Sequence, residues 1–185
     1  MLGKEGRRVP QVTFRIFEET LRQDVSTTDL FANKTVIVFA VPGAFTCPSS
    51  PIQVLGYNEY AKVFQANGID EIVCVSVNDP FALAHWAKEE GADHIRFMPD
   101  VNGAFTREMG MLVNLSDKGM GKRSRRYSML VKDGIIEKMF VETNALGVMP
   151  EVSNAETMLN YINPTVEKPE KAATLMRMWR AVLAA

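Results

Sequence analysis

Two short apolar runs, each followed by a helical pattern, constrain the fold of this chain more than any other feature. Residues 34–41 (KTVIVFAV) are rich in β-branched and aromatic side chains and run into a Pro-Gly pair. Residues 71–79 (EIVCVSVND) form a second run, which ends in Asn-Asp and is followed by Pro80. Apolar runs bounded by turn residues are typical of buried strands. The alternation of strands and helices therefore predicts an α/β protein with a central mixed β-sheet.

Capping signals place two of the helices. Residues 52–65 carry apolar side chains at close to helical spacing and end before an Asn-Gly pair. Residues 81–90 follow Asp79, a good N-cap, and Pro80, a residue favoured at the first helical position. The expected order is strand, helix, strand and helix, followed by a hairpin and a last helix.

The remaining elements complete the sheet. Residues 126–142 predict a β-hairpin around Lys-Asp-Gly, because Asp-Gly tolerates the positive φ angles of a tight turn. Residues 12–17 predict a further strand near the start of the chain. A helix over 153–162 is expected to open with a capping box formed by Ser153 and Glu156.

Composition limits the classes of partner. The 185 residues are 46% hydrophobic, which is enough for one globular domain with a real core. Lys plus Arg is 21 and Asp plus Glu is 22, so the net charge of −1 gives no reason to expect nucleic acid or membrane-surface binding. No apolar run approaches the ~18 residues of a membrane span or forms a signal peptide. We therefore expect a cytoplasmic protein, in which the two cysteines are free thiols.

The last part of the chain differs from the rest. We divide the chain into a domain over 1–163 and a C-terminal helical extension over 164–185, which begins with a polar stretch. The extension either packs on its own domain or docks onto a neighbouring subunit, and the sequence does not separate these. The residues expected on its apolar face are Leu175, Met178, Trp179, Val182 and Leu183.

Several segments resemble one known family, the peroxiredoxins, in the subgroup that includes bacterial peroxiredoxin–glutaredoxin hybrids. The resemblance runs from about 9 to 162, with the motifs in the order and spacing of the family. It implies a thioredoxin-like fold, a thiol peroxidase of the AhpC/TSA type, no metal or organic cofactor, and a homodimer. The segments are VPGAFT (41–46), SVNDPFALAHWAK (76–88), MPDVNGAFTREMGM (98–111), KRSRRYSMLVKDGIIEKMFVE (122–142) and VSNAETMLNYI (152–162).

The chain departs from the family at its active-site motif, Pro-x-x-x-Thr-x-x-Cys. Pro42 and Thr46 match, but Ser49 stands at the cysteine position and Cys47 lies two residues earlier. The match resumes without a gap at Gly56, so an insertion or deletion does not explain the change. Replacement of one cysteine by serine would explain Ser49 but not Cys47.

The supporting residues of the site are all present. A thiol attacks a peroxide O–O bond as the thiolate, whereas a free cysteine with a pKa of ~8.5 is mostly protonated at neutral pH. Helix N-termini and arginines favour the anion and stabilise the charge that develops on the leaving oxygen. By resemblance, Thr46 and Arg126 orient and stabilise the peroxide, and Pro42 shields the site from water. Cys47 is then the candidate nucleophile.

The local sequence bears on whether Cys47 can reach this pocket. On a rigid helix a two-residue shift would rotate the side chain by roughly 200°. Because residues before proline disfavour the α region, we expect Cys47 and Ser50 to be extended. Ser50 would then cap a helix that starts at Pro51, with Gln53 completing a capping box. Cys47 would lie on a loop that aims its thiol into the pocket.

Two interpretations of Cys47 stay open. In the first, Cys47 is the nucleophile of a peroxidase that reduces hydrogen peroxide or a small organic hydroperoxide. In the second, Cys47 is a small buried hydrophobe, and the chain is a catalytically silent scaffold or interaction protein. Ser49 is not a useful nucleophile, because a hydroxyl is far less acidic than a thiol.

The other polar candidates have ordinary explanations. Cys74 lies inside an apolar run and is expected in the core, which leaves the oxidised Cys47 to an external thiol such as glutathione, glutaredoxin or thioredoxin. Residues 118–128 hold five basic side chains that are expected to be solvated, apart from Arg126, and could attract an anionic reductant. His85 and His94 lack partners at metal-ligand spacing. The chain has no glycine-rich phosphate loop, which argues against a nucleotide enzyme.

Overall fold

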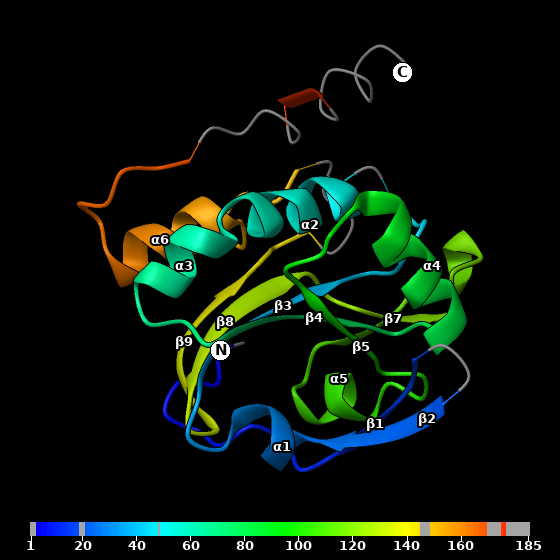
Figure 1. Cartoon of the computed structure of the whole chain (residues 1–185). Coiled ribbons are helices and arrows are strands. Elements are labelled where there is room, and N and C mark those ends of the chain that lie inside the picture. The colour runs from blue at the N-terminus through cyan, green and yellow to red at the C-terminus, as the bar shows by residue number, and fades with distance from the viewer. Residues whose placement is uncertain (1–2, 19–20, 48, 145–148, 170–174, 177–185) are drawn as a thin grey trace.

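The computed structural model describes residues 3–18, 21–47, 49–144, 149–169 and 175–176. Its centre is a five-stranded mixed sheet in the order β5-β4-β3-β8-β9 (Figure 1). The first three strands are parallel, and β8 and β9 run antiparallel to their neighbours. The strands are β3 (Thr35–Val41), β4 (Glu71–Ser76), β5 (Arg96–Pro99), β8 (Tyr127–Lys132) and β9 (Ile135–Val141). The predicted α/β fold with a central mixed sheet is confirmed.

Layers on both faces of the sheet explain why β3 is apolar throughout. Side chains of a strand alternate between faces, so Val36 and Val38 pack into one core and Ile37 and Phe39 into the other. Four helices cover the second face, and two short helices with a β-hairpin cover the first (Figure 1). The four helices are α2 (Ser49–Glu59), α3 (Ala61–Ala66), α4 (Pro80–Glu90) and α6 (Ala155–Ile162); the two short ones are α1 (Thr27–Phe31) and α5 (Ala104–Glu108).

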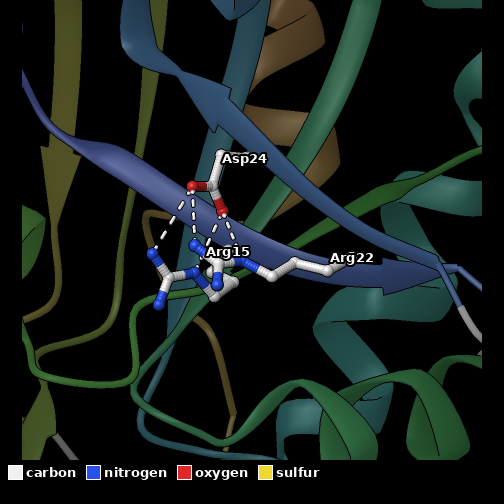
Figure 2. Close-up of polar contacts among 3 residues, drawn as sticks. All are labelled: Arg15, Arg22 and Asp24. Carbon is white, nitrogen blue, oxygen red and sulfur yellow. Dashed lines mark hydrogen bonds and ion pairs between the residues drawn. The ribbon is translucent and has the colours of Figure 1, made fainter.

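Two small antiparallel hairpins lie outside the central sheet. The first pairs β1 (Thr13–Glu18) with β2 (Leu21–Ser26), and the second pairs β6 (Leu112–Asn114) with β7 (Lys122–Ser124), with the 3-10 helix η1 (Ser116–Lys118) between them. The predicted strand over 12–17 corresponds to β1. An exposed ion cluster on the first hairpin brings Arg15 and Arg22 onto Asp24 (Figure 2).

Two local predictions are confirmed in detail. The Asp79 side chain accepts hydrogen bonds from the backbone N–H groups of Phe81 and Ala82, and Pro80 is the first residue of α4. The turn between β8 and β9 places Asp133 at φ +45° and Gly134 at φ +75°. Both residues have the positive φ that a tight hairpin turn requires.

Two predicted helix boundaries are wrong. The helix expected over 52–65 is two helices, α2 and α3, separated at Tyr60. The last helix begins at Ala155, and its N-cap is Asn154, whose side chain accepts from the backbone of Thr157. Ser153 does not form a capping box, because its groups are engaged in buried contacts beside the candidate site.

The C-terminal extension falls largely outside the described residues. Of the residues expected on its apolar face, only Leu175 is described, and it is exposed. Residues 164–169 follow α6, and Val166 packs against the helical core. The boundary at 163 and the apolar face of the extension stay predictions. None of the helices in the described ranges is long and apolar enough to cross a membrane.

Candidate active site

The topology of the sheet brings the two halves of the site together. Strand β3 ends at Val41 and leads into the loop that carries Cys47. Antiparallel pairing places Ala40 opposite Tyr127, the first residue of β8. Arg126, immediately before β8, therefore lies against that loop although 79 positions separate it from Cys47.

The Arg126 guanidinium is fully buried and surrounded by neutral oxygen acceptors and a thiol. Its Nη1 donates to Gln53 Oε1 at 2.6 Å and lies 3.4 Å from the Ser49 carbonyl oxygen. Its Nη2 donates to Ser49 Oγ at 2.7 Å. The same nitrogen lies 3.3 Å from Cys47 Sγ and 3.4 Å from Ser50 Oγ. Burial lowers the pKa of Arg126, but an arginine stays charged in proteins, so the site carries a fixed positive charge.

The Cys47 thiol is half-buried and faces four polar groups. Besides Arg126, its Sγ lies 3.3 Å from both Ser49 Oγ and Ser50 Oγ, and 3.9 Å from Thr46 Oγ1. Burial by itself raises the pKa of Cys47. The hydrogen bonds from the two serines, the charge of Arg126 and the Thr46 hydroxyl outweigh burial, so the pKa of Cys47 lies below its ordinary value. The arrangement favours a thiolate.

The start of α2 differs from the prediction. The helix begins at Ser49 rather than at Pro51, and Ser50 lies in its first turn, with its N–H donating to the Cys47 carbonyl at 3.2 Å. Gln53 does not close a capping box, because its side chain binds the buried Arg126 guanidinium instead. Cys47 nevertheless precedes the helix, as expected, and its thiol lies 3.3 Å from Arg126 Nη2.

A second set of buried groups lies behind Arg126 and was not anticipated from the sequence. Gln53 Nε2 donates to both the carbonyl and the Oγ of Ser153 at 3.1 Å. The Ser153 N–H and hydroxyl each donate to Glu142 Oε1 at 2.8 Å, and the Tyr57 hydroxyl donates to the Ser153 carbonyl at 2.9 Å. This series of hydrogen bonds connects Arg126 to the buried carboxylate of Glu142. A serine at a predicted helix cap indicates that its side chain has a hydrogen-bond partner. Nothing local in the sequence indicates that the partners of Ser153 are buried groups from other segments.

The loop before Cys47 is fixed by a hydrogen bond to Asn78 and by a hydrogen bond within the loop. The Ala44 N–H donates to Asn78 Oδ1 at 2.9 Å, and Thr46 Oγ1 donates to the Gly43 carbonyl at 2.7 Å. A Cβ on Gly43 would lie 2.6 Å from the Thr46 methyl and 3.2 Å from Arg123 Nη1, so only glycine fits there. Pro42 is buried in the same loop. Thr46, Cys47 and Arg126 therefore gather at one site, and Pro42 lies in the loop that leads to it.

The remaining candidates lie apart from this chemistry. Cys74 is completely buried in β4, as expected of a core residue, and burial raises the pKa of its thiol. His85 pairs with Glu89 on the exposed face of α4. Among the described residues, no three histidines, cysteines or carboxylates form a metal-ligand group.

Comparison with known proteins identifies the family of this chain. The Redoxin family model matches residues 4–159. A hybrid peroxiredoxin of Haemophilus influenzae is 53% identical over 164 residues, which cover 89% of this chain and 68% of the relative. A peroxiredoxin of Synechocystis is 44% identical, and the match covers 89% of this chain and 96% of that protein.

Solved structures agree with the sequence relatives. Prx3 of Vibrio vulnificus, in its reduced form with hydrogen peroxide, superposes with a TM-score of 0.79 at 34% identity, covering 86% of this chain and 98% of the other. The antioxidant protein of Plasmodium falciparum, a 1-Cys peroxiredoxin, superposes with a TM-score of 0.80 at 29% identity, covering 88% and 100%. The chain belongs to the Redoxin family and is a thiol peroxidase of the peroxiredoxin type.

Proposed function

We propose that Cys47 is the nucleophile with which this chain reduces hydrogen peroxide or a small organic hydroperoxide. The observation that carries the proposal is the position of Cys47 Sγ, 3.3 Å from the guanidinium of a fully buried arginine. Thiolate formation near a fixed positive charge is the requirement for attack on an O–O bond. Cys74 is a poor alternative, because its thiol is buried and burial raises its pKa.

The reaction follows from these positions. The Cys47 thiolate attacks one peroxide oxygen, an S–O bond forms, and the O–O bond breaks. The sulfur is oxidised by two electrons to a sulfenic acid, while the leaving oxygen takes a proton and departs as water or an alcohol. Arg126 and Thr46 hold the peroxide and stabilise the charge on the leaving oxygen, and Pro42 excludes water from the site.

An external thiol completes the cycle in a one-cysteine mechanism. The buried Cys74 does not present its sulfur to the surface, so a thiol from outside condenses with the sulfenic acid to a mixed disulfide and releases water. A second thiol then displaces Cys47 and yields a disulfide of the reductant. Glutathione, glutaredoxin and thioredoxin fit this role. The name of the Plasmodium relative, a 1-Cys peroxiredoxin, supports the mechanism.

The proposed setting is a cytoplasmic homodimer. Two aromatic side chains near the site, Phe45 and Phe81, are 58% and 65% exposed. The Phe45 ring lies 6.2 Å from the ring of His85, which lies four residues after Phe81 on α4 and so on the same side of that helix. Exposed apolar groups gathered on one surface favour a protein contact there.

The test is peroxide consumption with excess dithiothreitol by the unaltered protein, Cys47→Ser and Cys74→Ala. We expect Cys47→Ser to lose activity and Cys74→Ala, the matched control, to keep it. Dimedone, which traps sulfenic acids, should label one site per chain after one equivalent of peroxide, and that site should be Cys47. Full activity in Cys47→Ser would contradict the assignment of Cys47 as the nucleophile.

The competing proposal is a redox-silent scaffold, which the serine at position 49 favours. It predicts peroxide consumption no faster than the dithiothreitol blank in all three proteins. It also predicts a Cys47 thiol that alkylates as slowly as a free cysteine. Either result would turn attention from the peroxide to protein partners.

A further inference from the structure

Two serine hydroxyls lie beside the contact between the Cys47 sulfur and the buried guanidinium, within reach of both groups. Ser49 Oγ and Ser50 Oγ each lie 3.3 Å from Cys47 Sγ, and both side chains are fully buried. We propose that Ser49 is a further catalytic residue of the peroxidase, whose hydroxyl donates a hydrogen bond to the Cys47 thiolate and couples it to Arg126. The proposal rests on Cys47 being the nucleophile. In the family this position holds the nucleophilic cysteine. Here Ser49 would instead donate a hydrogen bond to the nucleophile.

The direction of the hydrogen bonds follows from the donors available. A guanidinium only donates, so Arg126 Nη2, at 2.7 Å, gives a proton to a lone pair of Ser49 Oγ. The single hydroxyl hydrogen of Ser49 is then left to donate. Among the described residues, Cys47 Sγ is the acceptor within reach of that oxygen. The order of donation is therefore from Arg126 to Ser49 to the sulfur.

The two serines are not equivalent. Ser49 Oγ accepts from Arg126 at 2.7 Å, whereas Ser50 Oγ lies 3.4 Å from the same nitrogen. A hydroxyl that accepts a strong charge-assisted hydrogen bond is polarised and becomes a better donor. Ser49 should therefore stabilise the thiolate more than Ser50, although their distances to the sulfur are equal.

Loss of this donor should change reactivity in opposite directions at low and high pH. A hydrogen bond to a charged group contributes enough that Ser49→Ala should raise the pKa of Cys47 by about one unit. Below both pKa values the thiolate fraction then falls about tenfold. A more basic thiolate is intrinsically more nucleophilic, by about threefold per pKa unit. The net expectation is an alkylation rate about threefold lower at low pH and about threefold higher above both pKa values.

The experiment measures iodoacetamide alkylation against pH in the Cys74→Ala background, where Cys47 is the remaining thiol. The variants are Ser49→Ala, Ser50→Ala and Ser116→Ala, the last an exposed serine in η1 that serves as control. We expect crossing pH profiles for Ser49→Ala, a smaller shift for Ser50→Ala and none for Ser116→Ala. A parent-like pKa in Ser49→Ala, or a rate that falls equally at every pH, would overturn the proposal.

The design separates this inference from the proposed function. If Cys47 is not the nucleophile, Cys47→Ser is as active or as inactive as the unaltered protein, and the Cys47 thiol has an ordinary pKa. If only the role of Ser49 is wrong, the parent is active with a depressed pKa, and Ser49→Ala leaves that pKa unchanged. Should Ser49→Ala fail to fold, Ser49→Thr retains the hydroxyl, and we expect it to keep the depressed pKa. An ordinary pKa in folded Ser49→Thr would contradict the proposal.

Discussion

Two arginine sites among the described residues differ in how the positive charge is surrounded. On the β1–β2 hairpin, Arg15 Nε and Arg22 Nη2 contact Asp24 at 3.0 and 3.2 Å, and all three side chains are at least 41% exposed (Figure 2). Arg126 is fully buried, and its contacts are neutral oxygens and a thiol. Water screens the first cluster, so its ion pairs contribute little to stability.

The difference indicates what the buried cluster is built to hold. A buried charge is costly unless it is hydrogen-bonded and paired with an opposite charge. Nη1 and Nη2 of Arg126 are hydrogen-bonded and its buried Nε has no partner among the described residues. The carboxylate of Glu142 is linked to it through Ser153 and Gln53. The Cys47 thiolate is the anion that can contact the guanidinium directly. Formation of the thiolate thus places an anion directly against the Arg126 guanidinium.

The largest expected effect comes from removing the buried charge. Arg126→Ala should lower kcat/KM for peroxide by about 100-fold or more, since loss of one preorganised donor costs about 10² to 10³ in rate. It should also raise the pKa of Cys47, because the charge that lowers it is gone. Steady-state peroxidase kinetics and alkylation profiles measure both. Arg15→Ala is the control from the exposed cluster, and equal losses in the two variants would remove the distinction between them.

An intermediate effect is expected from a carboxylate placed on the buried arginine. Gln53→Glu would put an anion at the position that now accepts from Arg126 Nη1 at 2.6 Å. The new carboxylate would compete with the thiolate as the partner of Arg126 and raise the pKa of Cys47 by about one unit. Peroxidase activity at neutral pH should fall about threefold to tenfold, and alkylation against pH should show the shift.

Gln53→Leu separates charge from packing in the same position. It should destabilise the protein by about 1–3 kcal/mol, because Arg126 and Ser153 each lose a buried partner. The pKa of Cys47 should change less than in Gln53→Glu, since no charge is added. A larger change of the Cys47 pKa in Gln53→Leu than in Gln53→Glu would show that the position of Arg126, and not added charge, controls that pKa.

The sequence sufficed for the parts of the fold that local rules determine. The apolar strands β3 and β4, the Asp79 cap of α4 and the Asp133-Gly134 turn were predicted, because each follows from composition or turn chemistry within a few residues. Strands β6 and β7 are short and partly polar, with no apolar run to mark them. The alternation of apolar and polar residues along β2 is equally weak. Strands β2, β6 and β7 therefore form because they pair with neighbouring strands in the folded protein.

The site shows the limit of the same reasoning. Thr46 and Arg126 follow from the family's motifs and Cys47 from its place two residues before the motif's cysteine position, but the sequence predicts a helix cap for Ser50 and Gln53. Local rules favour capping for such residues, whereas the buried guanidinium, 73 positions away from Gln53, offers a stronger partner. The capping box predicted at Ser153 is wrong for the same reason, because Ser153 binds the carboxylate of Glu142 on a separate segment. Long-range charge therefore overrides local capping at this site.

The smallest expected effect concerns the exposed cluster. Hydrogen bonds from Arg15 and Arg22 lower the pKa of Asp24 to about 2, against about 3.9 in an unfolded chain. Because the folded pKa is depressed, the stabilisation is present above about pH 4 and is lost as the pH falls toward 2. Asp24→Asn should therefore lower the melting temperature slightly at pH 5 and low salt, and the difference should vanish near pH 2 or in about 1 M salt, where charges are screened within about 3 Å. Thermal unfolding at these conditions gives the measurement, and a large salt-resistant loss would mean that this exposed cluster, like the buried one, is a structural element of the fold.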